Sequence, residues 1–143
     1  MKASLPFCRR VLLVCAGLFV AVALVIALGV IPPVKADTTP GASPEDAVPA
    51  FWVNVGLNLL VAVVIASIAL WSKRRSRGST SALVVLGLVA LLGGLALVDA
   101  AFAFRGHGPS MQIASTLLFV CAAADILAGA AVVTTAFLRP KEA

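Results

Sequence analysis

The chain has 143 residues, of which 62% are hydrophobic and only 12% are charged, and its formal net charge is +5. A soluble domain is about 45–50% apolar and about 25% charged. This composition excludes a soluble globular enzyme, a disordered regulator and a disulfide-stapled secreted domain. We therefore expect an integral membrane protein.

Four apolar stretches are long enough to cross the hydrocarbon core of a bilayer, which takes about 20 residues of helix. They are Val11–Ile31, Ala50–Trp71, Ser81–Phe104 and Ile113–Leu138. The stretches are apolar on every face and do not alternate, so they favour helices over the strands of a β-barrel. The sequence predicts an all-α bundle of four transmembrane helices, which forms a single membrane domain over residues 1–143.

The connecting segments are short, and all eight prolines of the chain lie outside the four spans. An external loop is expected over 32–49, a cytoplasmic loop over 72–80, an external turn over 105–112 and a tail over 139–143. The composition of 32–49, rich in Pro, Ala, Thr and Asp, predicts an extended and partly polyproline tether. Because proline kinks a helix when it lies in the interior, the four spans are predicted to be straight.

Basic residues predict the orientation in the membrane. Nine of the eleven lie at the N-terminus, in the second loop or in the tail, and only Lys35 and Arg105 lie elsewhere. The positive-inside rule then places both termini in the cytoplasm. We interpret the cluster in the second loop as a topology anchor and not as a nucleic-acid site; its members are Lys73, Arg74, Arg75 and Arg77.

The first span leaves a second interpretation open. A basic start with Lys2, Arg9 and Arg10, followed by the small-residue motif Val34-Lys35-Ala36, resembles a cleavable signal peptide. Cleavage would leave three spans. The apolar run is longer than the 7–15 residues usual in signal peptides, so we favour an uncleaved anchor.

Four amide or carboxyl side chains lie inside the predicted spans: Asn54, Asn58, Asp99 and Asp125. An ionised carboxylate in hydrocarbon costs about 2.5–3.5 kcal/mol, so each aspartate must be protonated, paired or next to water. At a rise of 1.5 Å per residue, Asp99 lies about 7 Å and Asp125 about 18 Å from the external ends of their spans. This difference excludes a shared-proton pair but allows a staircase from Asp99 through Asn58 to Asp125.

Small residues share a helix face with each of these polar groups, which predicts that the polar groups face other helices. The three faces are Asn58, Ala62, Ala66 and Ala69 in the second span; Ala96, Asp99 and Ala103 in the third; and Ser115, Ala122, Asp125, Gly129 and Ala136 in the fourth. Near the external surface, Arg105 or His107 is the expected partner of Asp99. Towards the cytoplasm only Ser67, Thr134 and Thr135 offer polar groups.

The polar groups admit two interpretations, as interhelical hydrogen bonds or as a titratable site for protons or a cation at Asp125. The chain has one histidine and no spacing typical of zinc or phosphate sites, so we predict no catalytic residue and no metal site, and the sequence indicates no cofactor.

The favoured function is a non-catalytic subunit or accessory protein in the lipid bilayer of the bacterial inner membrane. Its expected partners are other membrane proteins or further copies of itself, and no nucleic acid. The alanine-rich helices and the absence of tyrosine favour the bacterial origin. One alternative is a small proton- or cation-coupled transporter or channel that uses Asp125 and Asp99. The other is a subunit that helps to hold a quinone, a pigment or a lipid near Asn54, Asn58 and Asp99.

Overall fold

The computed structural model describes residues 5–36, 44–71, 77–105 and 109–138, which are helical apart from a turn residue after two of the helices. The elements are α1 (Leu5–Val25), the π-helix η1 (Ile26–Val30), α2 (Ile31–Lys35), α3 (Pro44–Trp71), α4 (Arg77–Phe104) and α5 (Pro109–Leu138). The first three follow one another without a break and form what we call the first rod. The first rod, α3, α4 and α5 are each long and apolar enough to cross a membrane. The predicted all-α architecture is therefore confirmed, and the fold is that of a multi-pass membrane protein; the orientation of the termini stays a prediction.

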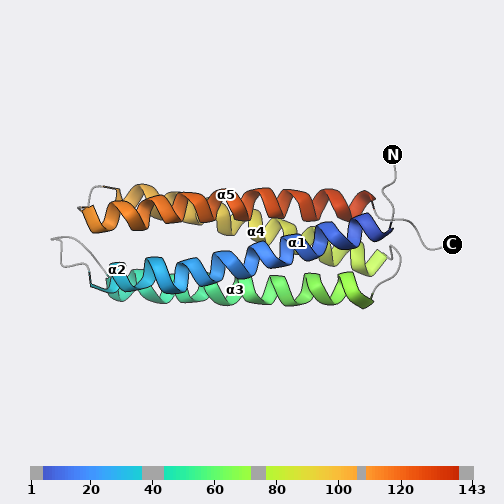
Figure 1. The fold of residues 1–143 in the computed structure, drawn as a ribbon, viewed down its shortest axis with the longest axis horizontal. Helices are drawn as coiled ribbons and strands as arrows, with labels where there is room; N and C mark the ends of the chain where they lie inside the picture. Colours follow the sequence, from blue (N-terminus) through green and yellow to red (C-terminus); the bar gives the residue numbers. More distant parts are fainter. Residues whose placement is uncertain (1–4, 37–43, 72–76, 106–108, 139–143) are drawn as a thin grey trace.

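The four rods lie side by side and run alternately in opposite directions (Figure 1). α4 and α5 form the most extensive helix pair, and α1 packs against both α3 and α5. α3 and α4 contact each other only sparsely. The bundle is thus tightly packed on three sides and loosely closed on the side between α3 and α4.

The core consists of two apolar clusters, one towards each end of the bundle. The cluster near the start of α3 includes Phe51 and Leu118, and the cluster near the end of α3 includes Ile65 and Val132. Asn58 and Asp125 are buried between these two sets of positions on α3 and α5. We call the level of Asn54, Asn58 and Asp125 the polar layer.

Several prolines begin helices and do not mark loops. Pro44 and Pro109 are the first residues of α3 and α5, and two prolines form the first turn of α2. The N–H groups of a first turn have no partner within the helix, so proline loses no hydrogen bond there. Pro49 lies inside α3, close to its start.

The predicted connecting segments are consequently too long. The extended tether predicted over 32–49 is wrong at both ends, which are helical to Lys35 and again from Pro44, and 37–43 lies outside the described residues. The predicted turn over 105–112 is helical from Pro109, and the predicted loop over 72–80 is helical from Arg77.

The first rod is not a continuous α-helix, because the π-helix interrupts it; the straightness of the spans stays a prediction. The backbone N–H of Ile31 donates to the carbonyl of Ile26, five residues earlier. In an α-helix, residues four apart turn by about 40° around the axis at each step. A π-turn holds more residues, so residues four apart are rotated less around the axis. Ile26, Val30 and Val34 are spaced by four, and all three are buried.

Glycines bring α4 and α5 into backbone contact. A Cβ atom on Gly87 would lie 2.8 Å from the carbonyl oxygen of Gly129, and a Cβ on Gly129 would lie 2.8 Å from the carbonyl oxygen of Gly87. A Cβ on Gly94 would lie 3.1 Å from the carbonyl oxygen of Ala122. The two helices can approach this closely only because these positions lack side chains.

Arg9 joins the first rod to the end of α3. Its Nε donates to the carbonyl oxygen of Ala69 at 3.0 Å, and its Nη2 donates to that of Leu70 at 3.5 Å. These carbonyls belong to the last turn of α3, where they lack partners within the helix and form the negative end of its dipole. Besides its predicted contribution to topology, Arg9 therefore caps α3.

Gly87→Ala is expected to lower the free energy of unfolding by about 1–3 kcal/mol, because its methyl group meets the backbone of Gly129. Gly56→Ala on α3 is the matched control: nothing lies within 4 Å of its Cβ position. Alanine there should be neutral or stabilise the helix by up to about 1 kcal/mol. Unfolding in mixed detergent micelles, followed by circular dichroism, measures both. Equal stability of the two variants would contradict the backbone contact.

Candidate functional site

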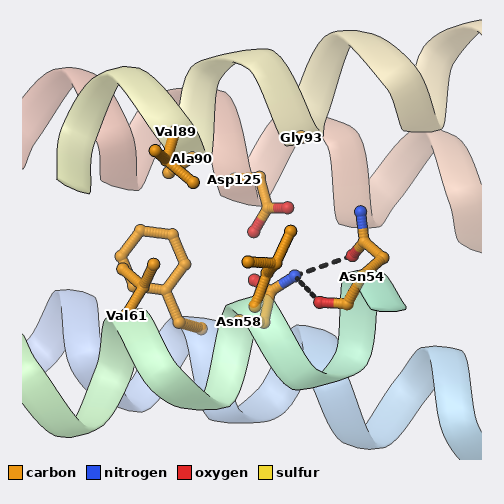
Figure 2. A pocket seen from close by; sticks show the side chains of 9 residues that line it. Asn54, Asn58, Val61, Val89, Ala90, Gly93 and Asp125 are labelled. Atoms are coloured by element: carbon orange, nitrogen blue, oxygen red, sulfur yellow. Dashed lines mark hydrogen bonds between the residues drawn. The ribbon is translucent and has the colours of Figure 1, made fainter. Parts of the chain in front are cut away.

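A small cavity lies at the polar layer. α3 and α4 provide most of its lining, with one residue each from α1 and α5: Phe19, Asn54, Leu57, Asn58, Val61, Val89, Ala90, Gly93 and Asp125. Figure 2 shows Asp125 between the upper and lower pairs of helices, with its carboxyl group towards the two asparagines of α3. The centre of a water molecule can occupy ≈ 20 Å³ of this cavity. Since about 10–15 Å³ is needed for one water, the cavity holds about one.

Asp125 is the most constrained group of the cavity. Its side chain is only 1% exposed, and its Oδ1 atom is buried without a hydrogen-bond partner. Among the described residues that line the cavity there is no Lys, Arg or His to act as a counter-charge. Burying an ionised carboxylate without a counter-charge is strongly unfavourable. The site therefore favours a ligand or a proton that satisfies this carboxyl group.

The two asparagines form a fixed pair. The Nδ2 atom of Asn58 donates to the backbone carbonyl of Asn54 at 3.0 Å and to the Oδ1 of Asn54 at 2.7 Å. A backbone carbonyl only accepts, so the nitrogen and not the oxygen of Asn58 must lie on that side. The Oδ1 of Asn58 is thus left as an acceptor. These bonds follow from the spacing of four, which puts both residues on one face of α3.

Gly93 bounds the cavity on α4 and is absent from the residues predicted for the site. A Cβ atom there would lie 3.8 Å from Nδ2 of Asn54 and 4.0 Å from Oδ2 of Asp125, which are ordinary contacts. The signal available in the sequence is the pair Gly93-Gly94 in a leucine-rich span. Gly94 permits the approach of α5, which leaves its neighbour Gly93 beside the cavity.

The small-residue faces predicted on α3 and α5 are found in the core. On α3, Ala62 and Ala69 are buried with Asn58, and Ala66 is half-buried. The predicted face of α5 is buried throughout, from Ser115 to Ala136. Ser115 also donates its hydroxyl to the carbonyl oxygen of Ala101 on α4 at 2.8 Å.

The face predicted on α4 does not lie against the other helices of this chain. Ala96, Asp99 and Ala103 are all exposed on the outside of the bundle. The reason is that Gly87 and Gly94 allow a closer approach than alanine, and they turn a different face of α4 towards α5. Asp99 is also six residues beyond Gly93, about 9 Å along the helix. The expected staircase from Asp99 through Asn58 to Asp125 is therefore not formed.

The predicted partners of Asp99 are only partly described. Arg105 is exposed after the end of α4, and within the described part of the chain it makes no ion pair with Asp99. His107 lies outside the described residues, as do three residues of the topology anchor: Lys73, Arg74 and Arg75. Of Arg77 only the backbone is described, as the first residue of α4.

Two hydroxyl groups nearer the end where α1 begins are engaged by their own helices. Ser67 donates to the carbonyl oxygen of Val63 at 2.8 Å, and Thr134 donates to that of Ala130 at 2.9 Å. Their hydroxyl protons are therefore directed at the backbone, and the polar layer does not continue through them.

The cavity at the polar layer is by itself too small for a quinone or a pigment, because it holds about one water. Across the described ranges, no three His, Cys, Asp or Glu side chains come together to hold a metal ion. Comparisons of the chain with protein-family models, curated proteins and solved structures find no match. Its function must therefore be argued from its own geometry.

Asn58→Ala is expected to lower the free energy of unfolding by about 1–3 kcal/mol, because both hydrogen bonds of the asparagine pair are lost. In the matched variant Asn54→Ala, the bond from Asn58 to the backbone carbonyl remains, so its loss should be smaller. Denaturation in detergent micelles measures both variants. A larger effect of Asn54→Ala would show that the Asn58 amide does not organise the layer.

Proposed function

We propose that the protein is a non-catalytic subunit of a membrane complex in the bacterial inner membrane, and that the outer face of α4 binds a helix of another protein. The observation that supports this proposal is the position of Asp99. It lies inside an apolar helix, yet its side chain is exposed on the outside of the bundle.

A carboxylate on the lipid-facing side of a membrane helix is unfavourable, and ionisable residues in such helices nearly always face protein or water. Ala96 and Ala103 lie about one turn to either side of Asp99 and are also exposed. Small residues at this spacing let a second helix approach closely. A partner helix on this stripe would remove Asp99 from lipid and give it a hydrogen-bond donor.

The charge of Asp99 indicates the chemistry of the partner. A second copy related by two-fold symmetry would bring two Asp99 side chains towards each other, and like charges in a membrane repel strongly. A helix with an Arg, Lys, His or Asn side chain at the same depth complements Asp99 instead. The proposed partner is therefore a different chain with such a donor.

Replacement of Ala103 by a photoreactive phenylalanine analogue tests this interface in native membranes. Illumination is expected to produce one cross-linked product with a different protein, and Asp99→Leu should reduce its yield several-fold. The same analogue at Val63, which is exposed on α3, is the control and should not give this product. Cross-linking to a second copy alone, or a monodisperse single chain in mild detergent, would contradict the proposal.

A second candidate is proton or cation transport through Asp125. It is supported by the burial of this carboxyl group beside a cavity and by the unpartnered Oδ1 atom. Intramembrane carboxylates of this kind are frequent in proton relays.

For this second candidate, Asp125→Asn should abolish flux in proteoliposomes while the helical content is retained. Asp99→Asn is the matched control and should keep flux, because Asp99 faces away from the cavity. A fluorescent pH indicator inside the vesicles measures proton entry. Normal flux in Asp125→Asn, or no flux in the unmodified protein, would rule out this function.

A further inference from the structure

We propose that Asp125 carries a proton in the folded protein and that its cavity opens to lipid between α3 and α4. It is then a proton-binding carboxylic acid that small apolar molecules reach from the bilayer, and an apolar carbodiimide modifies it. The inference concerns the same group as the second candidate function but does not depend on transport. A protein that shows no proton or cation flux would still react with the carbodiimide.

The hydrogen bonds around the carboxyl group suit an acid better than a carboxylate. The Asn58 side chain interacts with Asp125, but its amide nitrogen already donates to two acceptors of Asn54. An ionised Asp125 would keep one oxygen unpartnered, and the described residues that line the cavity include no counter-charge. A protonated Asp125 brings a donor of its own to the polar layer, and it needs no counter-charge.

The cavity also fits a single water molecule next to the acid. The point where a Cβ of Gly93 would lie is 3.8 Å from Nδ2 of Asn54 and 4.0 Å from Oδ2 of Asp125. A water in the space between this position and the two polar atoms can accept from the amide and exchange hydrogen bonds with the carboxyl group. With about one water in place, the polar layer has a mobile donor and acceptor although it is surrounded by apolar core.

Access from the side follows from the loose contact between α3 and α4. The cavity is partly open, and its lining residue Leu57 is 43% exposed, whereas Phe19, Val61 and Ala90 are buried behind it. Val89 and Gly93 on the facing helix are half-buried. Because the cavity itself holds only about one water, an apolar molecule from the bilayer is expected to enter by displacing the Leu57 side chain and parting the loosely packed helices α3 and α4.

Reaction with a carbodiimide requires the proton. The acid transfers its proton to one nitrogen of the carbodiimide, and the carboxylate oxygen forms a bond to the central carbon. The acyl group then moves from this oxygen to the neighbouring nitrogen and gives a stable N-acylurea. No atom is lost in either step, so the protein gains the mass of one whole carbodiimide. A permanently ionised carboxylate cannot take the first step.

The test treats the full-length protein in lipid nanodiscs with dicyclohexylcarbodiimide and maps the adduct by peptide mass spectrometry. We expect one adduct on Asp125 and none there in Asp125→Asn. Leu57→Ala should increase the rate of modification several-fold, and Gly93→Ala should decrease it several-fold by filling the cavity. Leu60→Ala, at another exposed position of α3, is the matched control and should react at the original rate.

Absence of an adduct on Asp125 in both the unmodified protein and Leu57→Ala, with helical content intact, would overturn the proposal, because the second variant removes the barrier to entry. Faster reaction with a water-soluble carbodiimide would overturn the opening towards lipid. Modification of Asp125 in a protein that shows no flux would leave this inference standing and reject transport. Flux without modification of Asp125 would support transport and overturn this inference.

Discussion

A carboxyl group at the middle of an apolar bundle, without a counter-charge, is the constraint on which the rest of this structure depends. Asp125 is excluded from solvent because α5 lies in backbone contact with α4 through Gly87, Gly94 and Gly129. The apolar clusters above and below hold the helices at the separation that the polar layer needs. Asn58, fixed by Asn54, supplies the polar surface that an apolar core would otherwise lack. The cavity beside this group is lined mostly by α3 and α4, on the least tightly packed side of the bundle.

The four helices could be predicted from the sequence because apolar length alone decides them. The burial of Asp125 and Asn58 was also predictable, since small residues recur on the same face of α5 and α3. The failure at Asp99 has a physical reason. α4 carries a face of alanines and a face with glycines, and the spacing of these residues does not indicate which face packs against α5. A glycine allows backbone contact, whereas an alanine keeps a methyl group between the two helices. α4 therefore packs against α5 with its glycine face.

Other features depend on tertiary position and leave no local signal. Arg9 and Arg10 are adjacent and identical, but Arg9 reaches the last carbonyls of α3 and Arg10 is exposed. The effect of a proline depends on its position along a helix, because proline disrupts a helix in its interior yet fits its first turn. The two intramembrane aspartates differ in the direction in which their side chains point. Asp125 faces the core of its own chain, and Asp99 is exposed on the outside of the bundle.

The π-helix of the first rod has a consequence for how the chain tolerates changes in its length. A π-turn is the form in which a helix absorbs one surplus residue while the segments on both sides keep their faces. Loss of one residue here, such as the largely exposed Leu28, would close the turn into a regular α-helix and leave both flanks in register. The same deletion within α1 or α3 would rotate everything beyond it by about 100° and turn core side chains towards lipid. Natural variation in the length of this rod should therefore concentrate at Ile26–Val30.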